Sequence, residues 1–233
     1  MMNSVLNFDA LLAPPLFSQL LHGAQFTLML FVACWILAVS LGILLAVLRI
    51  SGWPFSERLV AIYVAYHQNV PMLAHLFLWY FGISTLLPAG LQDWTSNHGG
   101  EFIFATIAIG LYMAAYFSED IRSGLRSVPG GQTEAARSLG MGFLASMRYV
   151  VLPQAINNAI PTFTNHTIVL FKNTSLAMAL GAAEMTYAVR EVENETFLTF
   201  ETYIVATVFY LAISLILMAV GAAAARRVRL PAH

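Results

Sequence analysis

The chain has 233 residues, of which 59% are hydrophobic and only 10% are charged, and its formal net charge is −1. So much apolar surface excludes an ordinary soluble domain and indicates an integral membrane protein. A single cysteine, Cys34, excludes a disulfide framework within the chain.

Long apolar runs predict an all-α fold, in which residues 1–233 form a single transmembrane domain with five transmembrane helices. The predicted spans cover approximately residues 26–48, 59–87, 102–121, 156–180 and 203–225. Crossing the hydrocarbon core takes about 20 helical residues, which these runs supply. Pro71 interrupts the second span, and Pro161 lies near the start of the fourth.

Basic residues predict the orientation of this five-span chain. Loops alternate sides, and one side then holds most of the basic residues: Arg49, Arg58, Arg122, Arg126, Arg137, Arg148, Arg226, Arg227 and Arg229. Cytoplasmic loops carry an excess of lysine and arginine. We therefore expect a periplasmic amino terminus and a cytoplasmic carboxyl terminus. The opposite loops are acidic, which suits either contact with another protein or simple solvation.

A polar, arginine-bearing stretch over residues 131–155 separates two apolar runs. Its first part, with Glu134, Ala135 and Ala136, is rich in helix formers, and Gly140 suits the left-handed cap that ends a helix. A second short helix, over about residues 143–151, is predicted to stop at Pro153, which lacks an amide hydrogen. Two short helices that meet at a glycine predict a cytoplasmic knob that contacts a soluble partner.

The second span contains polar residues, which are costly at membrane depth unless they pair or line a watered cavity. Gln68 and Asn69 stand just before Pro71, where a broken helix would expose backbone groups. Gln68 is predicted to share a helix face with Met72 and His75. Gln68 and Asn69 are candidates for a substrate path.

The fourth span carries a predicted polar stripe with spacings of three, four and seven residues: Thr162, Asn165, His166, Lys172 and Asn173. One interpretation is a wall of the translocation path, in which Lys172 binds a substrate carboxylate. The other is that Lys172 pairs structurally with a neighbour such as Glu119, Glu184 or Glu201, or extends its ammonium group to the membrane surface. Ser175, a further path candidate, and Thr174 could equally satisfy carbonyl groups of their own helix.

The sequence contains none of the nucleotide-binding, catalytic or metal-binding motifs that we searched for. The phosphate-binding pattern G-x-x-x-x-G-K-[ST] does not occur, so ATP hydrolysis would require a separate chain. No HExxH pair, Ser/His/Asp spacing or Cys/His cluster occurs either. We therefore expect no catalytic residue, metal site, cofactor or nucleic-acid partner.

The spacing of Glu134, Ala135, Ala136, Gly140, Leu152 and Pro153 resembles the cytoplasmic loop of ABC importer permeases, which docks in a cleft of the ATPase subunit. Flanking segments are similar to polar amino acid permeases, especially those for glutamate and aspartate: residues 23–28, 69–73, 78–82, 131–132 and 172–176. The resemblance covers about residues 20–225.

The resemblance implies a type I importer permease of the bacterial inner membrane. Its partners would be ATP-binding cassette subunits, a second permease subunit (identical or a paralogue) and a periplasmic solute-binding protein. Many relatives carry arginine where Gln68 stands, so glutamate, aspartate, glutamine and basic amino acids all remain open as substrates. The alternative, an ion-coupled secondary amino acid transporter or channel subunit, is disfavoured because no inverted internal repeat is evident.

Overall fold

The structure is a computed structural model that describes residues 6–228, and these residues form helices and no strand. The predicted all-α fold is therefore confirmed. The helices are α1 (Phe8–Leu11), α2 (Pro14–Ile50), α3 (Pro54–Asn69), α4 (Met72–Phe77), η1 (Leu78–Gly82), η2 (Ile83–Leu86), α5 (Ala89–Asn97), α6 (Gly100–Arg126), α7 (Gly130–Ser138), α8 (Phe143–Ser146), η3 (Met147–Val151), α9 (Leu152–Asn173), η4 (Thr174–Leu180), α10 (Met185–Thr196) and α11 (Thr199–Val228). Arg229, which entered the orientation argument, lies outside the described residues.

Three of the described helices, α2, α6 and α11, are long and apolar enough to cross a membrane. The second predicted span is divided among α3, α4, η1 and η2, and the fourth consists of α9 and η4. The second is broken because Val70 adopts an extended conformation and Pro71 stands before the first residue of α4. The count of five spans stays a prediction, whereas the break at Pro71 is confirmed.

The chain forms two compact units, and each takes its residues from separate parts of the sequence. The first comprises the chain up to Ile36, Pro71–Gly110 and Leu170–Leu215. The second comprises Leu37–Val70, Leu111–Val169 and the chain from Ile216 onward. Helices α2, α6, α9 and α11 therefore contribute residues to both units.

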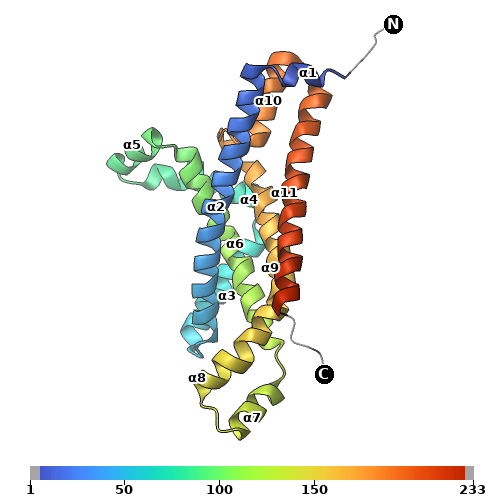
Figure 1. Cartoon of the computed structure of the whole chain (residues 1–233). Helices are drawn as coiled ribbons and strands as arrows, with labels where there is room; N and C mark the ends of the chain where they lie inside the picture. The colour runs from blue at the N-terminus through green and yellow to red at the C-terminus, as the bar shows by residue number, and fades with distance from the viewer. Residues whose placement is uncertain (1–5, 229–233) are drawn as a thin grey trace. The chain divides into compact units, whose positions relative to one another are not determined.

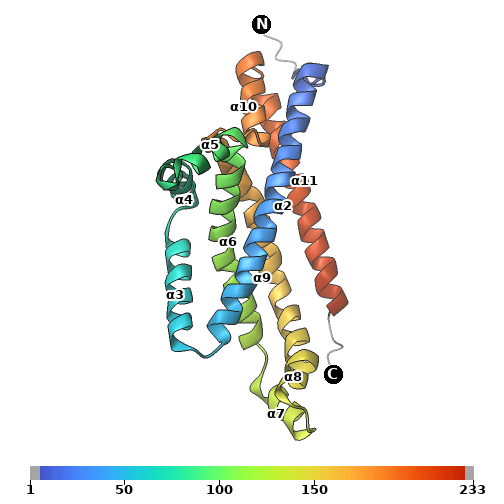
Figure 2. The same ribbon diagram turned by 90° about the vertical axis from the view of Figure 1, so that its left-hand side faces the viewer.

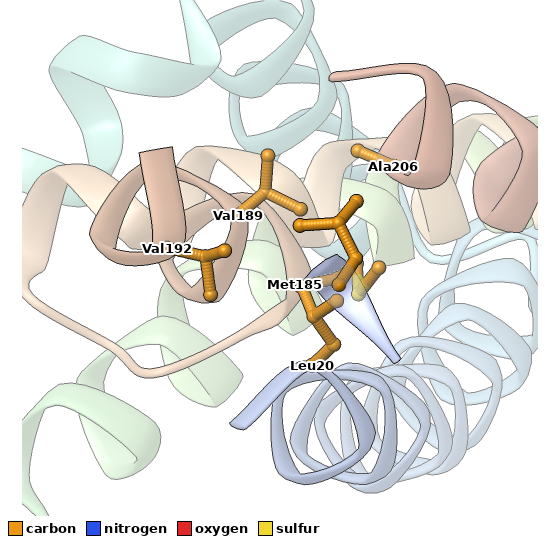
Figure 3. Packing of buried hydrophobic residues seen from close by; sticks show 6 residues of the cluster. Leu20, Met185, Val189, Val192 and Ala206 are labelled. Carbon is orange, nitrogen blue, oxygen red and sulfur yellow. The ribbon is translucent and has the colours of Figure 1, made fainter. Parts of the chain in front are cut away.

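In the first unit α10 lies beside the first part of α2 and the first part of α11 (Figure 1). Their contact is apolar: Leu20 of α2, Met185, Val189 and Val192 of α10 and Ala206 of α11 are buried together (Figure 3). Aromatic rings add edge-to-face contacts at centroid distances of 5.5 Å for Phe26 and Phe102 and 5.4 Å for Phe31 and Phe171.

In the second unit α3 runs alongside the C-terminal part of α6 (Figure 2). Val60 and Val64 of α3 pack with Ala114 and Ala115 of α6 in a buried apolar cluster. Helix α6 also approaches α9 closely at Gly124, where an added Cβ would lie 2.6 Å from the Ala155 carbonyl oxygen. The missing side chain at Gly124 thus allows α6 and α9 to pack backbone against backbone.

Candidate functional site

The polar stretch of the sequence forms a helical hairpin of α7 and α8 in the second unit (Figures 1 and 2). Helix α7 ends in a Schellman turn: the Gly140 amide donates to the Arg137 carbonyl at 2.9 Å and the Met141 amide to the Ala136 carbonyl at 3.1 Å. Gly140 has a φ of +79°, which a residue with a side chain adopts at a cost. The predicted helix end at Gly140 is confirmed.

The hairpin gathers most of the predicted coupling residues. Glu134 and Ala135 are exposed on α7, and Ala136 is buried on the face that packs against α8 and η3. Gln154, next to Pro153, donates a 3.4 Å hydrogen bond to the Gln132 side chain. The first turn of α9 thus lies against α7.

The predicted helix stop at Pro153 is wrong. Pro153 lies in the first turn of α9, and the chain stays helical from α8 through η3 into α9. The reason is the π turn over Met147–Val151, in which the Leu152 amide bonds the Met147 carbonyl five residues earlier. A π turn widens the coil. It thereby provides the space that the proline ring lacks in a regular helix.

Exposed apolar side chains at the tip of the hairpin were missed by the sequence argument, which treated the stretch as a polar island. Leu139 is 83% exposed, Leu144 80% and Phe143 65%. Large apolar side chains on both sides of Gly140 and Gly142 were the available signal. An apolar tip on a conformationally fixed hairpin is suited to binding a partner protein.

The path candidates Gln68 and Asn69 are both exposed at the end of α3. The Asn69 side chain donates to the Ala65 carbonyl of its own helix at 2.7 Å. The predicted common face of Gln68 with Met72 and His75 is wrong, because Met72 and His75 are buried while Gln68 is exposed. The break at Pro71 interrupts the helical periodicity on which that prediction relied.

His166 of α9 is half-buried and bonds a carboxylate that the sequence argument did not consider. Its Nδ1 lies 2.7 Å from Oδ2 of Asp120, which is buried on α6. The Tyr116 ring stands 5.1 Å from the imidazole. Asp120 follows Glu119 directly, and this carboxylate pair within an apolar helix was the signal available in the sequence.

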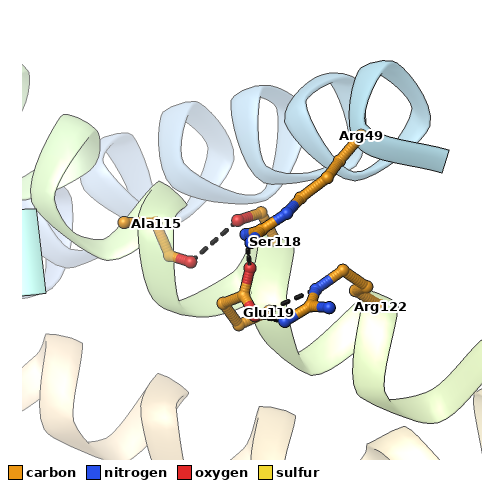
Figure 4. A network of polar contacts seen from close by, with 5 residues as sticks. All are labelled: Arg49, Ala115, Ser118, Glu119 and Arg122. Atoms are coloured by element: carbon orange, nitrogen blue, oxygen red, sulfur yellow. Dashed lines mark hydrogen bonds and ion pairs between the residues drawn. The ribbon is translucent and has the colours of Figure 1, made fainter. Parts of the chain in front are cut away.

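Glu119 binds two arginines in the second unit (Figure 4). It accepts hydrogen bonds from Arg49 of α2 and from Arg122, one turn further along α6, whose Nε lies 3.0 Å from Oε2. A carboxylate shared by two guanidinium groups is strongly held, because every bond to it is charge-assisted.

Lys172, Asn173 and Ser175 belong to the first unit, whereas Gln68, Asn69 and His166 belong to the second. Lys172 is exposed, and no ion pair of its ammonium occurs among residues 6–228. Asn173 is half-buried. The Ser175 and Thr174 hydroxyls donate to the carbonyls of Lys172 and Phe171 at 2.7 and 2.6 Å, so the predicted hydrogen bonding within the helix is confirmed.

The glutamates suggested as structural partners of Lys172 bind other groups. Glu119 holds Arg49 and Arg122, and Glu201 accepts a 2.8 Å hydrogen bond from the Asn7 amide. Glu184 caps α10. Among the described residues no ion pair joins Lys172 to these glutamates, and the role of Lys172 stays a prediction.

Glu184 is the best-satisfied buried carboxylate of the first unit. Its oxygens accept hydrogen bonds from the amides of Thr186 and Tyr187, each at 2.9 Å, and from the Tyr210 hydroxyl at 2.6 Å. Burial nevertheless raises the pKa of the Glu184 carboxyl, an effect that these hydrogen bonds only partly offset. The hydrogen bonds of Glu184 therefore connect the start of α10 to Tyr210 of α11.

The part of the chain that the structure describes contains no cluster of three or more His, Cys, Asp or Glu residues that could hold a metal ion. What the fold and the hairpin define is a class of protein: a multi-pass helical membrane component whose α7–α8 hairpin exposes an apolar tip.

The comparisons with known proteins identify the family. Residues 38–230 match the binding-protein-dependent transport system inner membrane components, and the chain belongs to this family. It is 35% identical over 200 residues to the probable amino-acid permease protein YxeN of Bacillus subtilis, covering 86% of this chain and 87% of the relative. It is 30% identical over 215 residues to the glutamate/aspartate import permease protein GltJ of Escherichia coli, covering 91% and 87% respectively.

A solved structure agrees with this assignment. The crystal structure of an amino acid ABC transporter with histidines superposes with a TM-score of 0.82 at 28% identity, covering 97% of this chain and all of that chain. The resemblance to type I importer permeases and the fold expected from it are therefore confirmed, and the chain is a transmembrane transport component of ABC importers.

Proposed function

We propose that this chain forms the membrane path of an ABC importer for polar amino acids, with glutamate and aspartate among the candidates. Its relatives carry names of amino acid permeases, which supports the substrate class. The observation that carries the proposal is the α7–α8 hairpin, whose tip exposes Leu139, Phe143 and Leu144 above a fixed Schellman turn.

In this proposal the hairpin is cytoplasmic and docks in a cleft of an ATP-binding cassette subunit, with Glu134, Ala135, Ala136, Gly140 and Pro153 shaping the docked surface. The amino terminus is periplasmic, as the arginine distribution indicates. Two permease subunits, two ATPase subunits and a periplasmic solute-binding protein complete the importer. ATP binding would draw the two hairpins together and open the path outward, and hydrolysis would reset it.

Transport in reconstituted vesicles tests this function. Uptake of labelled glutamate, aspartate or glutamine should require the ATPase subunit, ATP and loaded binding protein, and it should survive collapse of the ion gradients. Uptake that proceeds without the ATPase subunit and stops when the gradients collapse would instead identify an ion-coupled transporter.

For the path itself, Lys172 is the residue that we propose to meet a substrate carboxylate, because it is exposed and its suggested internal partners bind other groups. Gln68, Asn69, His166, Asn173 and Ser175 remain path candidates. Lys172→Gln should reduce uptake of acidic substrates and leave assembly and basal ATP hydrolysis intact. Arg190→Gln, at an exposed position of α10, is the matched control. Normal uptake by the Lys172 variant would exclude it from the path.

A further inference from the structure

The second unit contains a pocket of about 680 Å³ that the transport mechanism does not use. This open pocket is lined by residues from the end of α2, the turn into α3, the end of α6 and the chain from η3 into α9. Ser56 holds this turn together, since its hydroxyl lies 2.9 Å from the carbonyls of both Leu48 and Trp53. The pocket is thus built by fixed helix ends.

Positive charge dominates the polar part of the pocket. Arg49, Arg122 and Arg126 line it, against Glu57 in the lining and Glu119 beneath it. Glu119 is shared between Arg49 and Arg122, so neither arginine has a carboxylate of its own. Nε of Arg49 is buried and has no hydrogen-bond partner within residues 6–228. This donor is closed off from the pocket, so an anion would bind the exposed Arg126 side chain and balance the excess of guanidinium groups over carboxylates.

The rest of the pocket is apolar, with Val47, Ile50, Leu125, Met147, Val151 and Leu152 along its wall. Beside it, at the start of α3, the Trp53 and Phe55 rings are mostly exposed, and their centroids lie 5.4 Å apart. Exposed aromatic residues at the ends of spanning helices are typical of the membrane–water interface. The pocket therefore combines an arginine-lined end with an apolar side next to this aromatic pair.

We propose that this pocket binds the phosphate headgroup of an anionic phospholipid, with the first acyl carbons against the apolar wall. Basic pockets between helices on the cytoplasmic side are a known form of lipid recognition. The apolar wall and the adjacent aromatic pair favour a lipid over a carboxylate of the ATPase subunit, for which a purely polar pocket would serve. The proposed orientation of the chain decides which leaflet supplies the lipid, but lipid binding to the pocket does not depend on that orientation.

The test is native mass spectrometry of the full-length permease with its copurifying subunits in detergent. Phosphatidylglycerol should be retained in preference to phosphatidylethanolamine with the same acyl chains. Arg126→Gln should lower the retained phosphatidylglycerol about fivefold, the equivalent of about 1 kcal/mol for one basic group at an anionic surface. Arg126→Lys should keep most of it, and Arg137→Gln, at an exposed position of α7 outside the pocket, should keep all of it.

Three results would overturn the proposal. The first is equal retention of the two lipids, or an Arg126→Gln variant that retains phosphatidylglycerol like the unmodified chain. The second is displacement of the lipid by inorganic phosphate at similar concentration, which would assign the pocket to a soluble anion. The third is loss of the ATPase subunit from Arg126→Gln with lipid retention unchanged, which would make the pocket a protein contact. None of these results depends on which amino acid the importer carries.

Discussion

The capped end of α10 and the α7–α8 hairpin differ in whether their characteristic side chains find partners within the chain. At α10 a fully buried carboxylate, Glu184, has its hydrogen bonds supplied by Thr186, Tyr187 and Tyr210 of the same unit. At the hairpin the backbone is equally well ordered by hydrogen bonds, yet Leu139 and Leu144 are more than three-quarters exposed. The first region has its hydrogen bonds completed within the unit, whereas the second exposes the apolar side chains that we propose to dock on the ATPase subunit.

The strongest way to break this comparison is to remove the cap of α10. Glu184→Ala leaves two amides and the Tyr210 hydroxyl without their acceptor and should lower the free energy of unfolding by on the order of 3 kcal/mol. Thermal unfolding in detergent measures the loss. Glu193→Ala is the control, because Glu193 lies on the same helix and accepts only an exposed hydrogen bond from Thr199. Equal thermal unfolding midpoints for Glu184→Ala and Glu193→Ala would show that the cap does not stabilise the fold.

A smaller effect is expected at the turn of the hairpin. Gly140→Val forces a β-branched residue to a φ of +79° and should cost about 1–2 kcal/mol locally. The permease should still insert, but the ATPase subunit should no longer copurify, because α8 is reoriented. Gly142→Ala is the control, since Gly142 has a φ of −67° and open space around it. Undisturbed copurification and hydrolysis with Gly140→Val would remove the hairpin from the coupling mechanism.

The pH dependence of stability sharpens the comparison at Glu184. Because burial raises the pKa of this carboxyl in the folded state, the folded protein binds the proton more tightly than the unfolded chain does. Stability should therefore fall as the pH rises from the ordinary glutamate pKa, about 4.3, to the higher folded-state pKa. Glu184→Gln, which cannot titrate, should flatten this part of the thermal-midpoint curve. An unchanged curve would mean that other groups cause the slope.

The smallest effect on stability is expected at the exposed tip. Leu144→Ser should change the free energy of unfolding by no more than about 0.5 kcal/mol, because an 80% exposed side chain loses little packing. It should nevertheless weaken the response of ATP hydrolysis to loaded binding protein. Melting and stimulated hydrolysis measured on one preparation separate the two effects. A destabilised Leu144 variant would mean that the tip packs within the chain.

Much of this arrangement followed from the sequence. Apolar runs and prolines are local signals, so the helical fold and the break at Pro71 were predictable. Gly140 was predictable for the same reason, since a left-handed cap depends on one residue and its neighbours.

Pairings between distant residues were not predictable. Asp120 meets His166, and Glu119 meets Arg49, only because α6 packs against α9 and α2, and nothing in the local sequence encodes those contacts. The continuation of the helix through Pro153 was missed because a π turn has no clear sequence signature. The exposed leucines of the tip were missed because composition alone does not report which apolar side chains find a partner.

The unbroken helical path from α8 through η3 into α9 has a consequence for how this chain tolerates changes in length. A helix advances about 100° per residue, so one residue inserted between Phe143 and Asn173 would turn the hairpin by about that angle relative to the part of α9 after the insertion. An insertion in the turn between Leu139 and Gly142 changes no helical register. Insertions and deletions at this end of the protein should therefore be confined to that turn, while the number of residues from Phe143 to Asn173 is held constant.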